Sequence, residues 1–117
     1  MLGKTIRSFR YAINGLRTVW LEEHNFRTDI YISIVVLAAA SFLDFSNTEW
    51  LFVIMAIILV LSGEIVNTAV EDIMNKVNPE YDPVVGKIKD TMAAYVLLTS
   101  AGSAVVGLIV FINHFTQ

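Results

Sequence analysis

The chain has no cysteine among its 117 residues, which excludes disulfides, thiol catalysis and cysteine-based zinc sites. Charged residues are scarce at 16% and hydrophobic residues reach 56%, whereas soluble domains have about 25% and about 45–50%. The motifs GxGxxG, HExxH and GxSxG are missing, and Gly3-Lys4-Thr5 lacks the upstream glycine of a P-loop. The sequence contains no basic patch with interleaved aromatic residues of the kind that binds nucleic acid. The composition predicts one integral-membrane domain over residues 1–117.

Residues 1–24 are predicted to form an amphipathic helix that lies on the membrane surface. Six apolar residues recur at intervals of three or four and share one helical face: Leu2, Ile6, Phe9, Ile13, Leu16 and Trp20. The basic residues of this segment lie off that face, which suits contact with lipid head groups. The alternative is an ordinary amphipathic helix of a soluble bundle.

Three transmembrane helices are predicted, over residues 26–45, 49–76 and 84–113. The third carries the strongest signal, because 23 uncharged residues separate Asp90 from His114 and a span needs about 20. The first is weaker, because the fourteen uncharged residues between Asp29 and Asp44 could by themselves form a buried core helix. The two prolines, at positions 79 and 83, predict a loop between the second and third spans.

Small polar and small apolar residues predict two details of these helices. Thr48 can cap the second span, just ahead of Glu49. Thr99, Ser103 and Gly107 recur every four residues on the third span, so they form a strip that suits close helix packing.

All eight basic residues fall into two blocks, which predicts the orientation of the chain in its membrane. Five lie before or at the start of the first span and three lie between the second and third: Lys4, Arg7, Arg10, Arg17, Arg27, Lys76, Lys87 and Lys89. Since basic segments stay in the cytoplasm, the N-terminus and residues 76–90 are expected to be cytoplasmic and the C-terminus outside.

A polar stripe in the second half of the second span is the main functional signal. Glu64, Asn67, Glu71 and Asn75 fall on one side of a helix with about 3.6 residues per turn. Such groups are costly in a membrane unless they face a cavity, a metal or partners. The stripe therefore predicts a site on the cytoplasmic side of the membrane.

The carboxylates near this site suit two roles. Glu23 and Glu71 are candidate Mg²⁺ ligands, because Mg²⁺ takes one or two carboxylates together with phosphate oxygens and water. Glu64 lies about 10 Å farther along the helix, where its carboxyl group can serve as a general base. The alternatives are solvated interfacial carboxylates for Glu23 and Glu71, and a structural hydrogen bond between helices for Glu64.

Three further polar residues belong to the predicted site. Asn67 would bind the metal or orient a neighbouring group. Lys89 and Asp90, at the start of the third span, would hold a phosphate and an amine or ribose group. The alternative for these two is that they anchor the helix at the interface.

The segments Glu64–Glu71 and Gly86–Asp90, with Asn25–Arg27 following Glu23, together resemble the small prokaryotic membrane diacylglycerol kinases, a family that includes undecaprenol kinases. The resemblance covers roughly residues 5–112 in the order of the family. Three shorter segments resemble the undecaprenol kinase branch more than the enterobacterial diacylglycerol branch: Thr48–Leu51, Asn67–Ala69 and Ala93–Leu98.

The resemblance implies a homotrimer in the bacterial plasma membrane, with an amphipathic surface helix and three membrane helices in each subunit. The family transfers the γ-phosphate of Mg-ATP to a lipid hydroxyl at the cytoplasmic interface, without a P-loop. By position, Glu23 and Glu71 match its metal-binding glutamates and Glu64 its proposed general base. The other matches are polar residues of the site or its surroundings: Asn67, Lys89, Asp90, Glu80, Arg27, Asp29 and Tyr11.

The implied roles of these residues differ. Glu80 and Tyr11 are expected to contact the nucleotide, with Lys89 and Asp90. Arg27 and Asp29 match a functional basic–acidic pair, assigned here to substrate binding.

The chain also departs from the family at three positions. Lys4 stands roughly where the enterobacterial branch has an arginine that contacts phosphate. Asn75 stands where the family often has aspartate, and we retain it as a nucleotide contact. Asp82 stands where the enterobacterial branch has a histidine, so contacts to the adenine are expected to differ.

The sequence thus predicts an all-α membrane protein that acts as an ATP-dependent lipid kinase, with direct transfer to undecaprenol as the first choice. Diacylglycerol is the alternative acceptor, which would give phosphatidic acid as the product. A non-enzymatic ion-binding or assembly protein of the membrane is the alternative from another class.

Overall fold

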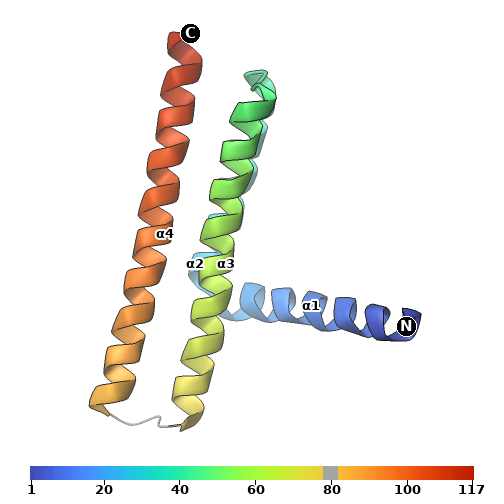
Figure 1. Ribbon diagram of the computed structural model, residues 1–117, viewed down its shortest axis with the longest axis vertical. Coiled ribbons are helices and arrows are strands. Elements are labelled where there is room, and N and C mark those ends of the chain that lie inside the picture. Colours follow the sequence, from blue (N-terminus) through green and yellow to red (C-terminus); the bar gives the residue numbers. More distant parts are fainter. Residues whose placement is uncertain (78–81) are drawn as a thin grey trace.

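The computed structural model describes residues 1–77 and 82–117, and every regular element in them is an α-helix (Figure 1). The helices are α1 (Leu2–Glu22), α2 (His24–Phe42), α3 (Asn47–Val77) and α4 (Pro83–Thr116). α2, α3 and α4 are each long and apolar enough to cross a membrane, which confirms the prediction of three such helices in an all-α chain. The bounds of the four helices differ from the expected ones by one to three residues at each end.

α3 and α4 are longer than a bilayer requires. With 31 and 34 residues they extend about 46 Å and about 51 Å, against about 30 Å for the hydrocarbon core of a membrane. Their paired ends continue past the level at which α1 crosses the bundle (Figure 1). The end of α3 and the first turns of α4 therefore have room to stand outside the hydrocarbon.

Small residues bring α3 and α4 close together. A Cβ added at Gly63 would lie 3.0 Å from Thr99 Oγ1, and Ser103 Oγ donates a hydrogen bond of 3.1 Å to the carbonyl of Ala56. The predicted packing strip is therefore confirmed for Thr99 and Ser103. It is wrong for Gly107, where an added Cβ would meet nothing within 4 Å.

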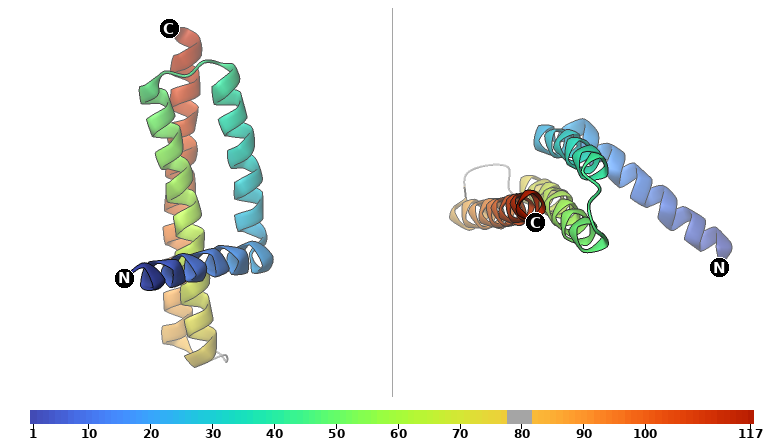
Figure 2. Two further views of the ribbon diagram at one scale, coloured as in Figure 1. Left: turned by 90° about the vertical axis from the view of Figure 1, so that its right-hand side faces the viewer. Right: turned by 90° about the horizontal axis from the view of Figure 1, so that it is seen from above.

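Both α2 and α4 pack on α3, but in the described residues they make no close backbone contact with each other (Figure 2). Many large apolar side chains of the three helices remain exposed, as expected for surfaces that face lipid or another subunit. The bundle is therefore open along one side.

The end of the bundle near the C-terminus has its own apolar core, made of Ala40, Phe45, Val53 and Val110. Here α3 begins with a capping box, in which the Ser46 N–H donates to Glu49 Oε1 at 2.8 Å and the Glu49 N–H donates to Ser46 Oγ at 3.2 Å. The prediction of Thr48 as the cap is thus wrong, because Ser46 has the three-residue spacing from Glu49 that this reciprocal pair needs.

A sharp corner joins α1 to α2, and α1 extends away from the other helices (Figure 2). Glu23 is the single residue between the two helices, with extended backbone angles of φ −109° and ψ 109°. Val19 and Phe26 are buried at the corner, and the rings of Trp20 and Tyr31 meet edge-on with centroids 5.7 Å apart. The remainder of α1, including its apolar face, is exposed.

Candidate active site

Five of the predicted site residues line one pocket between α2, α3 and α4, namely Asp29, Glu64, Asn67, Glu71 and Lys89. The pocket has a volume of about 470 Å³. Its complete lining is Asn25, Thr28, Asp29, Glu64, Asn67, Glu71, Lys89, Ala93, Val96, Leu97 and Ser100. Glu64, Asn67 and Glu71 follow one another at intervals of three and four, which explains why one face of α3 presents all three.

Glu64 is the buried acidic residue of this pocket, with 4% of its surface exposed. The negative charges of Asp29, Glu23 and Glu71 all lie within electrostatic range of its carboxylate. Glu23 thus contributes its negative charge to this acidic group from the α1–α2 corner, although it does not line the pocket. Like charges around a buried carboxyl group repel one another, so they favour a bound cation or proton.

The structural alternative for Glu64 was a hydrogen bond that joins two helices. In residues 1–77 and 82–117 no such bond involves its carboxylate, and only its backbone carbonyl is engaged, by Thr68 Oγ1 at 2.9 Å. Its neighbour Gly63 allows α4 to approach closely. The Glu64 carboxylate is therefore available to a ligand in the pocket.

Lys89 is the one basic residue in the pocket lining, and it reaches the pocket from the second turn of α4. Its Nζ donates a hydrogen bond of 2.9 Å to Asn75 Oδ1 on α3. Asn75 does not line the pocket itself, so the structure ties this predicted nucleotide contact to the lysine. Because asparagine is neutral, the bond orients the ammonium group without cancelling its charge.

The other predicted site residues lie apart from the pocket. Tyr11 is 71% exposed on α1, and Asp90 is exposed on α4. Arg27 Nη1 donates to the carbonyls of Trp20 and Leu21 rather than into the pocket. The predicted role of Glu80 falls outside the described residues.

Sequence reasoning missed three polar lining residues, Asn25, Thr28 and Ser100. A signal existed for the first two, because Asn25, Thr28 and Asp29 are spaced i, i+3 and i+4 and so share a helical face. Ser100 also had a signal, because Ala93, Val96, Leu97 and Ser100 are spaced i, i+3, i+4 and i+7 and so share one face of α4.

An apolar groove of about 510 Å³ continues from the pocket along the same three helices. Asp29 and Ser100 line both spaces. The remaining lining is mostly apolar: Ile32, Ser33, Val36, Val53, Ala56, Ile57, Val60, Ser103, Ala104, Gly107, Leu108 and Phe111. The pocket and the groove together offer a polar end and a long hydrocarbon-like end.

Similarity to known proteins runs along most of the chain, and the family model of prokaryotic diacylglycerol kinase matches residues 10–111. The chain belongs to the prokaryotic diacylglycerol kinase family. The diacylglycerol kinase of Escherichia coli (strain K12) is 28% identical over 112 residues, which are 96% of this chain and 92% of that relative. The undecaprenol kinase of Bacillus subtilis (strain 168) is 26% identical over 111 residues, which are 95% of this chain and 90% of that relative.

This member of the family is therefore a multi-pass membrane protein and a lipid kinase that uses ATP. The predicted resemblance and the predicted class of enzyme are confirmed, and the non-enzymatic alternative is excluded. The two relatives have nearly the same identity to this chain, 28% and 26%, but are named for different lipids. The comparison therefore does not identify the lipid acceptor.

The donor set of the pocket fits Mg²⁺ in the way that kinases hold it. In the part of the chain that the structure describes, no three acidic, histidine or cysteine side chains converge as a closed metal cage. Mg²⁺ seldom needs one, because it is usually bound by one or two carboxylates together with substrate phosphates and water. Glu71 in the pocket, with Glu23 whose charge reaches Glu64 from the α1–α2 corner, fits this requirement.

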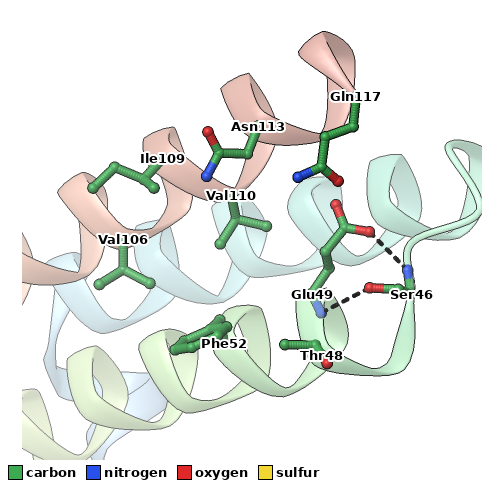
Figure 3. A pocket seen from close by; sticks show the side chains of 9 residues that line it. All are labelled: Ser46, Thr48, Glu49, Phe52, Val106, Ile109, Val110, Asn113 and Gln117. Atoms are coloured by element: carbon green, nitrogen blue, oxygen red, sulfur yellow. Dashed lines mark hydrogen bonds between the residues drawn. The ribbon is translucent and has the colours of Figure 1, made fainter.

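A second pocket, of about 590 Å³, lies at the end of the bundle near the C-terminus (Figure 3). It is lined by Ser46, Thr48, Glu49, Phe52, Val106, Ile109, Val110, Asn113 and Gln117. The Glu49 carboxylate is already engaged there, by the Ser46 N–H and by His114 Nδ1, the latter at 2.8 Å. This pocket holds none of the predicted site residues, and the pairing of His114 with Glu49 across 65 positions had no signal in the sequence.

Proposed function

We propose that this kinase transfers the γ-phosphate of Mg-ATP directly to the hydroxyl of a membrane lipid, in the pocket between α2, α3 and α4. The observation that carries the proposal is the junction of the polar pocket with the apolar groove at Asp29 and Ser100. A lipid alcohol has the two matching halves, a hydrocarbon chain for the groove and a hydroxyl group for the pocket.

Glu64 is the proposed general base. It accepts the proton of the lipid hydroxyl while that oxygen attacks the γ-phosphorus, and ADP leaves as the bond to the bridging oxygen breaks. Its place in the pocket lining and the absence of an interhelical hydrogen bond to its carboxylate, within the described residues, support this role. Asn67, one helical turn away, orients the reacting groups.

Glu23 and Glu71 are the proposed Mg²⁺ ligands. A Mg²⁺ ion held by these two carboxylates would supply positive charge near the phosphates of the nucleotide. Lys89, oriented by Asn75, offsets the charge that develops on the transferring group. Among the remaining residues, Tyr11, Glu80 and Asp90 keep their predicted role in contacting the nucleotide, and Asp29 keeps its predicted role in binding the acceptor.

Undecaprenol is the proposed acceptor. Its support is the likeness of Thr48–Leu51, Asn67–Ala69 and Ala93–Leu98 to the undecaprenol kinase branch. Diacylglycerol is the second candidate, because several relatives with 25–28% identity are named diacylglycerol kinase.

The proposal is tested with the purified full chain in lipid nanodiscs that contain both acceptors in equal amounts, with radiolabelled ATP and Mg²⁺. We expect labelled undecaprenyl phosphate to form faster than labelled phosphatidic acid. Faster labelling of diacylglycerol would reverse the choice of acceptor, and the absence of any labelled lipid would refute the proposed reaction in this pocket. A Glu64→Gln variant serves as the matched control for label that arises without the proposed base.

We also propose that the N-terminus and the active site face the cytoplasm of a bacterial plasma membrane, with the C-terminus outside. The gathering of all eight basic residues on α1, the start of α2, the end of α3 and the start of α4 supports this orientation. A homotrimer is proposed as the working assembly, because the three long helices also leave large apolar side chains exposed on faces outside the lipid groove, among them Leu51, Leu97 and Leu98. Light scattering of the detergent complex measures the subunit number.

A further inference from the structure

The α1–α2 corner depends on one arginine. α1 ends at Glu22, and the carbonyls of its last turn have no further helical N–H groups to accept from. Arg27, in the first turn of α2, supplies donors for two of them: its Nη1 donates to the carbonyl of Trp20 at 2.6 Å and to that of Leu21 at 3.1 Å. α1 has no basic residue of its own in its last turn, so this cation is the one that complements the negative end of the helix dipole there.

The same arginine also holds the residue at the corner. The Glu23 N–H donates to the carbonyl of Val19 at 2.9 Å and so completes α1. The Arg27 N–H donates to the carbonyl of Glu23 at 3.3 Å and so starts α2. With its backbone on Glu23 and its guanidinium on the end of α1, Arg27 connects both sides of the one extended residue between the helices.

The guanidinium leaves the Glu23 side chain free. In residues 1–77 and 82–117 no carboxylate lies within ion-pair distance of Arg27, and the charge of Glu23 instead acts on Glu64 in the pocket. Arg27 therefore fixes where the Glu23 carboxylate is without neutralising it.

We propose that Arg27 is a positioning residue that presents the Glu23 carboxylate to the active site by locking the end of α1 onto α2. This inference rests on the proposed role of Glu23 as a Mg²⁺ ligand, and it gives Arg27 a different role from the predicted binding of the lipid acceptor. Nη1 donates to two carbonyls of α1, which is the arrangement expected of a structural clamp.

The first test is a Mg²⁺ titration of kinase activity with the full chain in nanodiscs. Loss of a group that orients a metal ligand typically weakens metal binding by about 10-fold or more, so Arg27→Gln should raise the half-saturating Mg²⁺ concentration by about that factor. At saturating Mg²⁺, kcat should recover, and the KM values for ATP and lipid should stay near those of the parent. Arg27→Lys keeps the charge but lacks the fork of donors, so it should fall between the two.

A matched control and a double variant make this test specific. Arg17→Gln removes an arginine that is exposed on α1 and should leave the titration unchanged. Glu23→Ala should itself raise the Mg²⁺ requirement, and adding Arg27→Gln to it should cause no further rise, because a residue that acts only through Glu23 has nothing left to position.

The second test does not depend on activity. In a Trp50→Phe background, Trp20 is the only tryptophan, and its ring packs against Tyr31 at the corner. If Arg27 locks the corner, Arg27→Gln should increase the quenching of Trp20 fluorescence by acrylamide and change its emission, whereas Arg17→Gln should not.

Two results would overturn the proposal. One is a raised KM for lipid or ATP in Arg27→Gln with an unchanged Mg²⁺ titration, which would make Arg27 a substrate contact. The other is unchanged Trp20 fluorescence, which would show that the corner does not need Arg27. Glu23→Ala with normal Mg²⁺ dependence would instead refute the metal role of Glu23, and the fluorescence experiment would still decide whether Arg27 holds the corner.

Discussion

Replacing Gly63 by alanine should weaken the contact between α3 and α4 beside the active site. The new Cβ would lie 3.0 Å from Thr99 Oγ1 and 3.8 Å from a ring carbon of Tyr95. Thr99 is buried and its hydroxyl donates to the carbonyl of Val96 at 3.0 Å, so it cannot turn away without losing that bond. α4 must therefore move by a few tenths of an ångström.

The net magnitude combines two opposing effects. Overpacking of a close contact costs about 1–3 kcal/mol, whereas alanine in place of glycine gains about 1 kcal/mol in a helix interior. The free energy of unfolding of Gly63→Ala should therefore fall by up to about 2 kcal/mol. Gly102→Ala is the control, because its Cβ would meet nothing within 4 Å and only the helix gain of about 0.5–1 kcal/mol should remain.

Reversible unfolding in mixed micelles of a mild detergent and SDS, followed by circular dichroism, measures both variants. The double variant Gly63→Ala/Thr99→Ala should recover most of the loss, because it removes the hydroxyl that the new methyl group meets. Gly63→Ala with the same gain in stability as Gly102→Ala would refute the close contact, and failure of the double variant to recover would show that Thr99 is not its cause.

Three further predictions concern the pocket itself. Glu64→Gln should lower kcat by about 10²- to 10⁴-fold and leave ATP binding unchanged, as measured by steady-state kinetics and a nucleotide-binding assay; a variant that keeps most of its rate would remove the base assignment. Glu71→Ala should raise the Mg²⁺ concentration needed for half-maximal activity, and an identical titration would exclude Glu71 as a ligand. Asn75→Asp should convert the hydrogen bond to Lys89 into an ion pair and raise the KM for ATP, because part of the positive charge is then cancelled; Asn75→Ser, which adds no charge, should raise it less, and equal effects would show that the charge of Lys89 does not act on ATP.

The helices were largely predictable because membranes impose long stretches without charge, and such stretches are visible in the sequence. The capping error at the start of α3 was avoidable, because Ser46 and Glu49 have the spacing of a capping box whereas Thr48 does not. Gly107 repeated the spacing of Thr99 and Ser103, but a Cβ added there would meet nothing within 4 Å, although Val53 and Val110 still join α3 to α4 near its level. Sequence spacing does not reveal which position of a strip meets the neighbouring helix.

The candidate site was predictable where a single helix sets it and less so elsewhere. Glu64, Asn67 and Glu71 share a face of α3 by helical period alone, and the pocket does contain them. Lys89 and Asp29 reach the same pocket from other helices, which depends on tertiary alignment. Arg27 was assigned to the substrate from resemblance, and only the structure gives its bonds to the end of α1.

The open side between α2 and α4 has a consequence for how the enzyme would respond to its acceptor. An acceptor bound in a groove that opens sideways would enter from within the bilayer, by diffusion in two dimensions, and the product would return the same way. The rate should then follow the mole fraction of acceptor in the bilayer and fall when inert lipid is added, even at constant bulk concentration. With the acceptor in this groove, the lateral opening would make the composition of the surrounding membrane, rather than that of the aqueous phase, the quantity to which this kinase responds.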